Sequence, residues 1–213
     1  ATLATVATQR SDVVGHAGAP QQSARHEDIF VPGGIIDDRY RIGKKIGQGG
    51  MAMVFRADDM ELDETVALKV FIRPIEDDET LERFKQELRL SRKLSHPNVI
   101  RLHDIGVYLG HRYLSMEFLQ GKDLQDFMGK PMELHKGLDL LIQVCDGLEV
   151  AHQEGVIHRD MKPPNVFVTT KNIAKVMDFG IAKNTAAEGL TQAGLIFGTP
   201  QYMSPEQIND PRR

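Results

Sequence analysis

The chain has 213 residues, of which 41% are hydrophobic and 26% are charged, a balance that predicts a globular protein with a substantial core. Its formal net charge of −4 gives no general basic surface, which argues against nucleic acid as the principal partner. No run approaches the roughly 18 apolar residues of a membrane helix, and no secretory signal pattern opens the sequence, so we expect a cytoplasmic chain without a membrane segment. A membrane tether elsewhere in a longer parent protein remains open.

The first residues differ in composition from the rest of the chain. Residues 1–37 are rich in Ala, Thr, Gln, Ser and Gly and lack sustained periodicity. We therefore expect a disordered arm or linker there, with the folded domain beginning at residue 38.

Apolar residues then flank a glycine cluster. The pattern predicts a strand, a turn at Gly47, Gly49 and Gly50, and a second strand. Because glycine lets the backbone approach an anion closely, such a turn can aim its N–H groups at phosphates. A plain hairpin turn and a dinucleotide-binding fingerprint are the alternatives, and the fingerprint requires a helix after Ala52. A Walker A loop is excluded because no Gly-Lys-Ser or Gly-Lys-Thr sequence follows.

A strand and a helix are predicted next. Residues 64–71 form a β-rich run whose alternation places Ala67 and Lys69 on one face. A lysine inside a strand is either an edge residue that reaches solvent or a ligand for an anion. The following segment keeps helical spacing, with Asp77 or Asp78 as its candidate cap. Its apolar stripe comprises Leu81, Phe84, Leu88 and Leu94, with Glu87 beside it.

A hairpin and a second helix follow. Residues 99–104 and 112–117 predict paired strands, and residues 118–121 predict a short connector. Residues 138–152 predict an amphipathic helix. Its expected packing stripe consists of Leu138, Leu141, Cys145, Leu148 and His152. As the only cysteine, Cys145 cannot form an internal disulfide, and we expect it to be buried, with His152 lining the core.

The sequence HRDMKPPN at residues 158–165 crowds a carboxylate, two permanent cations and an amide into one loop. Asp160 can orient a hydroxyl and accept its proton, and Lys162 can neutralise charge on a transferring phosphoryl group. The amide oxygen of Asn165 can hold a magnesium ion. This composition suits phosphate chemistry.

Two short apolar strands frame a polar turn after this loop. Residues 165–168 and 174–177 predict an antiparallel hairpin, which brings Asn165 and Asp178 to the same open end. Two hard oxygen ligands would therefore converge where a metal-bound nucleotide could lie.

HRDMKPPN followed by the Asp-Phe-Gly of residues 178–180 resembles the catalytic and metal-binding segments of the protein kinases. The glycine cluster and the Val-Ala-Leu-Lys segment precede them in the order of that family, with Ala52 in place of its third glycine. The sequences of residues 49–51 and 199–207 are similar to those of the bacterial branch of these kinases.

The resemblance covers about residue 40 to the end and implies an α+β, two-lobed protein-kinase-like fold. A small lobe of antiparallel β-sheet plus one helix would occupy residues 38–117. The hinge would lie at residues 118–121, and an incomplete, mainly helical large lobe would occupy residues 122–213.

The resemblance also implies an ATP-dependent serine/threonine protein kinase that uses Mg²⁺. Asp160 would orient the substrate hydroxyl, and Lys162 would stabilise charge on the γ-phosphoryl group. Asn165 and Asp178 would bind Mg²⁺.

By the same resemblance, Lys69 would grip the phosphates of ATP, with Glu87 as its ionic partner and Glu82 as the alternative. The backbone of Glu117 and Leu119 would hydrogen-bond adenine. The full set of expected nucleotide contacts is Ile46, Gly47, Gln48, Gly49, Gly50, Val54, Ala67, Lys69, Met116, Glu117, Leu119 and Phe167.

Regulation by phosphorylation of the loop after Asp178 is expected as well. Arg159 supplies a cation that can receive a phosphorylated side chain, with Thr191 as the first choice of acceptor and Thr185 as the second. Thr199 would instead position the catalytic loop. A second copy of the kinase would carry out this phosphorylation.

The expected partners are protein substrates with serine or threonine hydroxyls. A pseudokinase or nucleotide-binding scaffold is the alternative, although the charged residues that such proteins tend to lose are all present. Because the family's later helices would follow Arg213, we expect this stretch by itself to have little activity.

Overall fold

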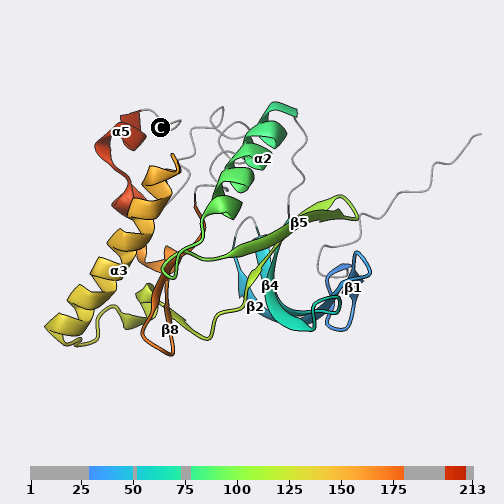
Figure 1. Ribbon diagram of the computed structural model, residues 1–213, viewed down its shortest axis with the longest axis horizontal. Helices are drawn as coiled ribbons and strands as arrows, with labels where there is room; N and C mark the ends of the chain where they lie inside the picture. The colour runs from blue at the N-terminus through green and yellow to red at the C-terminus, as the bar shows by residue number, and fades with distance from the viewer. Residues whose placement is uncertain (1–28, 50–51, 73–77, 180–199, 210–213) are drawn as a thin grey trace, which may run out of the picture.

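The computed structural model describes residues 29–49, 52–72, 78–179 and 200–209. They form two lobes, with a six-stranded antiparallel sheet and α2 in the first and a three-stranded sheet, α3 and α5 in the second (Figure 1). This arrangement confirms the expected α+β, two-lobed fold. No helix in these ranges combines the length and the apolarity that crossing a membrane requires.

The strands of the first sheet lie in the order β1-β2-β3-β4-β6-β5, and those of the second in the order β7-β8-β9. The strands are β1 (Ile35–Ile36), β2 (Tyr40–Gln48), β3 (Ala52–Asp59), β4 (Glu64–Phe71), β5 (Leu102–Tyr108), β6 (His111–Glu117), β7 (Gly121–Asp123), β8 (Val166–Thr169) and β9 (Ala174–Val176). The α-helices are α2 (Asp78–Lys93), α3 (Leu134–Gln153) and α5 (Pro205–Asn209), and the short 3-10 helices are η1 (Leu124–Phe127), η2 (Pro163–Asn165) and η4 (Pro200–Tyr202).

The glycine cluster lies between two paired strands, as predicted. β2 and β3 are antiparallel, and the Gly49 N–H donates to the Ala52 carbonyl at 2.9 Å. A strand, β3, therefore follows the glycine turn, which rules out the helix that a dinucleotide-binding fingerprint needs. Gly50 lies outside the described residues.

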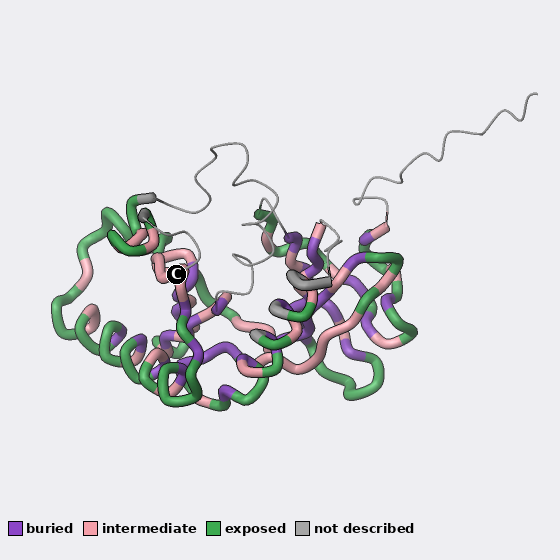
Figure 2. The backbone as a smooth tube through the Cα atoms, turned by 90° about the horizontal axis from the view of Figure 1, so that it is seen from above, coloured by how far each residue is buried: buried purple, intermediate pink, exposed green. Residues whose placement is uncertain are grey.

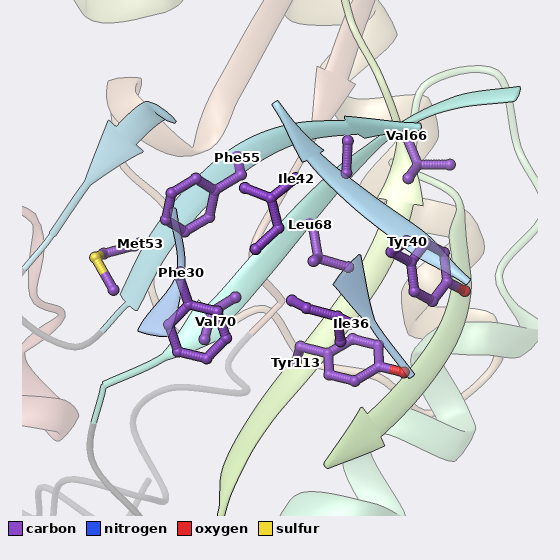
Figure 3. Packing of buried hydrophobic residues seen from close by; sticks show 11 residues of the cluster. Phe30, Ile36, Tyr40, Ile42, Met53, Phe55, Val66, Leu68, Val70 and Tyr113 are labelled. Carbon is purple, nitrogen blue, oxygen red and sulfur yellow. The ribbon is translucent and has the colours of Figure 1, made fainter. Parts of the chain in front are cut away.

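The core of the first lobe includes residues that we expected in a disordered arm. Phe30 is 3% exposed and packs its ring against Phe55 and His111, and Ile36 is fully buried (Figure 3). β1 also pairs with β2. The expected boundary after residue 37 is therefore wrong, and the lobe includes residues from at least 29 onward. The segment escaped detection because its two-residue strand is too short to establish a period.

One arginine in the β1–β2 turn binds two strands of this lobe, β3 and β5. Arg39 donates three hydrogen bonds of 2.7–3.1 Å to the carboxylate of Asp59, and a fourth of 3.3 Å to Asp104. Asp59 also accepts from the backbone N–H groups of Glu61 and Leu62 in the β3–β4 turn. The hydrogen bonds from Arg39 lower the pKa of Asp59 below its usual value, against the opposing effect of burial.

α2 presents the predicted apolar stripe to the sheet. Phe84 and Leu88 are completely buried, and the ring of Phe84 meets that of Phe71 edge to face at 5.4 Å. Leu94, just after the helix, packs into the core of the second lobe. The helix thus connects the two cores.

α3 packs through a different face from the one we predicted. Its buried residues are Leu140, Val144, Gly147 and Ala151. Leu138, Leu141, Cys145 and His152 are exposed, and Leu148 is half-buried, so the predicted stripe, the buried cysteine and the core-lining histidine are wrong. In Figure 2 much of this outer face is green. Apolar residues surround much of this helix, so spacing alone does not identify the packing face.

The packing face of α3 is fixed by a close backbone contact. A Cβ atom on Gly147 would lie 2.6 Å from the carbonyl oxygen of Asn98. Asn98 in turn donates from Nδ2 to Gln143 Oε1 at 3.1 Å and to the Ala174 carbonyl at 2.8 Å. Gln143 Oε1 also accepts from the Ala174 N–H at 2.9 Å, so α3, the loop after α2 and β9 form one connected unit.

Candidate active site

The predicted hairpin brings the catalytic loop and Asp178 together. β8 and β9 pair antiparallel with Val166 opposite Val176, and the Met177 N–H donates to the Asn165 carbonyl at 2.9 Å. Asn165, just before the hairpin, and Asp178, just after it, therefore lie at the same end of the hairpin, as expected. η2 begins with two prolines, which fix the backbone immediately before Asn165.

Three polar side chains of the catalytic loop contact one another. Lys162 Nζ lies 2.8 Å from Asp160 Oδ2, and Asn165 Nδ2 donates to the Asp160 carbonyl at 2.7 Å and to Oδ2 at 3.1 Å. These two acceptors use both N–H groups of the Asn165 amide, so its oxygen is the atom that suits a metal ion. Asn165 is 7% exposed, which holds the amide in one orientation.

His158 holds the backbone of this loop through hydrogen bonds, a role that we did not predict. Its Nε2 lies 2.7 Å from the Met177 carbonyl, and the Asp160 N–H donates to its Nδ1 at 3.2 Å. The carbonyl can only accept, so Nε2 carries the hydrogen of a neutral ring. Burial lowers the pKa of His158 below its usual 6.5, although the hydrogen bond to Met177 opposes this effect.

Two residues of the site have left-handed backbone conformations. The φ angle is 60° at Arg159 and 56° at Asp178. Side chains other than glycine rarely adopt this region, and such strain clusters at functional sites. The surrounding hydrogen bonds, including the one from Gln207 Nε2 to the Arg159 carbonyl at 2.8 Å, offset its cost.

Lys69 reaches from the first lobe to Asp178 in the second. Its Nζ lies 2.5 Å from Asp178 Oδ1. Partial burial raises the pKa of Asp178, but the charge and hydrogen bond of Lys69, with smaller effects of His158 and Lys162, lower it below its usual value. Asp178 is therefore a carboxylate at neutral pH.

The expected ionic partner of Lys69 on α2 remains a prediction. Glu87 belongs to α2, but its side chain lies outside the described residues. The alternative, Glu82, is wrong because its carboxylate is exposed and pairs with Lys85 at 2.6 Å.

An apolar cluster lies where the two lobes meet. Its buried members are Ala67, Ile100 and Met116, and Val54, Leu102, Phe118, Leu119 and Met177 pack against them. The cluster thus joins β3, β4, β6, the connector and the residue before Asp178. Its apolar walls suit a flat aromatic ring, with polar backbone groups at the connector.

Some expected nucleotide contacts lie together in this cluster and others do not. Val54, Ala67, Met116 and Leu119 belong to it, and Met177 is a member that we missed. Ile46 is 48% exposed at the end of β2. Phe167 is half-buried on the face of β8 opposite the buried Val166 and Val168. Gly47 pairs with Val54, and Gln48 Oε1 accepts from Lys45 Nζ at 2.7 Å.

Strand β6 ends at Glu117, immediately before the connector, and the backbone N–H of this residue is already hydrogen-bonded. It donates to the Arg101 carbonyl at 3.0 Å. Of the backbone groups of Glu117, only the carbonyl is therefore left as a contact for adenine. In the prediction that the backbone of Glu117 and Leu119 binds adenine, the contact from Glu117 is therefore its carbonyl and not its N–H.

The three threonines that we assigned to regulation, Thr185, Thr191 and Thr199, lie outside the described residues. Arg159, their expected partner, is half-buried. It lines a surface hollow of about 630 Å³ together with Tyr202 of η4, Ser204 before α5, and Glu206 and Gln207 of α5.

The site therefore contains two carboxylate–lysine pairs, Asp160 with Lys162 and Asp178 with Lys69, an amide oxygen suited to a metal, and an apolar cluster where the lobes meet. These groups can bind a metal-complexed phosphate compound, orient a hydroxyl and accept its proton. The two carboxylates, Asp160 and Asp178, lie on opposite sides of the β8–β9 hairpin in sequence and near its open end in space.

Comparison with known proteins gives consistent matches. Residues 40–213 match the family model described as Protein kinase domain. The chain is 41% identical over 187 residues to serine/threonine-protein kinase pkn3 of Myxococcus xanthus, covering 82% of this chain and 34% of that protein. It is 40% identical over 179 residues to probable serine/threonine-protein kinase PknB of Lactococcus lactis, covering 82% and 28%. The chain thus spans only about a third of the length of these relatives, or less.

Solved structures are also similar. The crystal structure of the Mycobacterium tuberculosis PknI kinase domain has a TM-score of 0.62 and 31% identity, covering 71% of this chain and 63% of that chain. The structure described as PpkA-294 apo form has a TM-score of 0.72, covering 84% and 71%; its 24% identity makes this a likeness of fold alone.

Proposed function

The chain belongs to the protein kinase family, within its bacterial serine/threonine branch, and on that premise we propose that its protein transfers the γ-phosphoryl group of ATP to serine and threonine hydroxyls of protein substrates. The observation that carries the proposal is the convergence of the Lys69–Asp178 pair and the Asp160, Lys162 and Asn165 cluster at one end of the β8–β9 hairpin. Lys69 of the first lobe would then act in the same site as four side chains of the second lobe.

The residues present fit ATP and Mg²⁺. The cluster around Ala67 and Met116 offers apolar contacts to adenine, and Glu117 and Leu119 adjoin it at the end of β6 and in the connector. The Asn165 oxygen and the Asp178 carboxylate are the hard ligands that Mg²⁺ prefers. ATP supplies the phosphoryl group, and Mg²⁺ supplies charge neutralisation at its phosphates.

The remaining side chains act on the hydroxyl and on the developing charge. Asp160 accepts a hydrogen bond from the substrate hydroxyl, orients it and takes its proton. Lys162, held against Asp160 at 2.8 Å, stabilises negative charge on the transferred group. Lys69 orients the phosphates, and its contact with Asp178 at 2.5 Å sets its position before they bind.

Regulation by loop phosphorylation is a second part of the proposal. A phosphate on Thr191, added by another copy of the kinase, would pair with the Arg159 guanidinium and order the loop. The half-buried position of Arg159 directly before Asp160 supports this, because an ion pair at Arg159 would restrain the backbone that holds Asp160. Mass spectrometry of the active protein should find phosphothreonine at 191, and full activity in Thr191→Ala would contradict it.

The function is tested by incubating the full-length protein with γ-labelled ATP, Mg²⁺ and a generic basic protein. We expect label on serine and threonine of the acceptor. Lys69→Met should reduce transfer at least about 100-fold because the phosphates lose their cation. Lys171→Met, which removes an exposed lysine from the β8–β9 turn, is the matched control. Nucleotide binding without transfer by the unmodified protein would favour a pseudokinase.

A further inference from the structure

A second set of contacts involves the side chain of Glu117, at the end of β6 and immediately before the connector. Glu117 Oε1 accepts from Lys175 Nζ at 2.7 Å and from the Arg101 N–H at 2.8 Å. The Glu117 N–H donates to the Arg101 carbonyl at 3.0 Å. The side chain of Glu117 is therefore held by Lys175 and by the backbone of Arg101, and its own backbone is held by Arg101 as well.

Lys175 connects this residue to the second lobe. It lies in the middle of β9, three residues before Asp178. The 98–101 segment runs beside β9: the Ile100 N–H donates to the Val176 carbonyl at 2.9 Å, and the Val176 N–H donates to the Asn98 carbonyl at 2.8 Å. The connector, the loop after α2 and β9 thus form a closed set of contacts around Glu117.

We propose that the Glu117–Lys175 ion pair is a positioning device that sets the connector for nucleotide binding. The inference rests on the proposed kinase function. Only the carbonyl of Glu117 is left for adenine, and its direction depends on how this residue is held. The ion pair fixes the side chain to β9, the strand that also delivers Asp178, so the adenine contact and the metal ligand share one support.

The exposure of the pair argues for orientation rather than for stability. The Lys175 and Glu117 side chains are 14% and 25% exposed, so water still screens the two charges in part. An ion pair that keeps some access to solvent contributes less to the free energy of unfolding than a fully buried pair. A pre-organised connector, in contrast, reduces the ordering that nucleotide binding must impose, which affects affinity directly.

The test uses the full-length protein and a fluorescent ATP analogue with Mg²⁺. Lys175→Met and Glu117→Gln should each raise the Kd and the KM for nucleotide about three- to tenfold. The kcat at saturating ATP should change less than about twofold, because the groups that act on the phosphoryl group are intact. Thermal unfolding without nucleotide should stay close to that of the unmodified protein.

Three further variants separate positioning from a structural effect. The double variant Glu117→Gln/Lys175→Met should bind no worse than either single variant, because both changes break one interaction. Lys175→Arg should keep most of the affinity. Lys171→Met should bind as tightly as the unmodified protein.

Unchanged nucleotide affinity in both single variants, or fully additive losses in the double variant, would overturn the positioning role while leaving the kinase function intact. Failure of the unmodified protein to bind nucleotide at all would overturn both.

Discussion

Asp178 receives contacts from residues that are distant in sequence. Lys69 on β4 meets its carboxylate at 2.5 Å, and the hairpin that precedes it is anchored to His158 through the Met177 carbonyl. Its φ angle of 56° turns the chain immediately after Met177. These contacts hold the carboxylate in its charged form, which a metal ligand requires.

Asp178→Asn should therefore weaken metal binding without unfolding the protein. We expect kcat to fall at least about 100-fold and the Mg²⁺ concentration for half-maximal activity to rise, since an amide binds Mg²⁺ less well than a carboxylate. A Mg²⁺ titration of phosphoryl transfer measures both effects. Asp58→Asn, on the exposed side of β3, is the control, and an unaltered titration in Asp178→Asn would show that this residue is not a metal ligand.

Short linear motifs made most of the central residues predictable. Asp160, Lys162 and Asn165 lie within six residues, and their chemistry can be interpreted from the sequence alone. The Glu117–Lys175 contact could not be found this way, because 58 residues separate its partners and neither has an unusual neighbourhood in sequence. Met177 was missed for a related reason, since its place in the apolar cluster depends on how the lobes meet.

At the scale of single elements, α3 shows why hydrophobic periodicity alone did not identify the packing face of a helix. Its predicted stripe and its actual stripe both have helical spacing, and the close contact of Gly147 with the Asn98 carbonyl distinguishes them. The hairpin of β8 and β9 was predictable because two short apolar runs surround a polar turn. β1 was not predictable because its only signal is pairing with β2.

The same substitution at two positions of α3 should have opposite effects. At Gly147 an added Cβ would meet the Asn98 carbonyl at 2.6 Å, so Gly147→Ala should lower the free energy of unfolding by about 1–3 kcal/mol. At Gly137 the nearest atom, Met132 Sδ, is 3.6 Å away, so Gly137→Ala should raise stability by about 0.5–1 kcal/mol through helix propensity.

Thermal unfolding of both variants, beside the unmodified protein, measures these effects. A stabilised Gly147→Ala variant would mean that α3 and the 98–101 segment do not approach as closely as described.

At the scale of the whole molecule, two sets of contacts hold the lobes in shape. Arg39 and Asp59 connect the strands of the first lobe at its edge, and segment 29–36 closes its core. Asn98 and Gln143 join the second lobe to the loop after α2. The first set involves a buried charge, and it therefore makes stability depend on pH.

Asp59→Asn should destabilise the protein by about 2 kcal/mol at neutral pH, because Asp59 is 2% exposed and binds Arg39 through charged hydrogen bonds. The unfolded carboxyl binds its proton near pH 3.8, and the folded one does so only at lower pH. The contribution of the pair is therefore complete above this range and is lost as the pH falls through it.

The measurement is the difference in unfolding free energy between the unmodified protein and Asp59→Asn, which should stay constant from about pH 7 to about pH 5 and shrink as the pH falls below 3.8. Asp58→Asn is the matched control, because this neighbour is half exposed and lies 3.5 Å from Arg56. A pH-independent difference would contradict the ion pair.

If one site contains both the residues that bind ATP and the residue that acts on the substrate hydroxyl, Asp160→Asn should separate binding from phosphoryl transfer. This variant keeps the size of the side chain but removes the group that orients the hydroxyl and accepts its proton. In the full-length protein we expect phosphoryl transfer to a serine/threonine substrate to fall at least about 100-fold, while the Kd for ATP with Mg²⁺ changes less than about twofold. Turnover by Asp160→Asn at the rate of the unmodified protein would contradict the account.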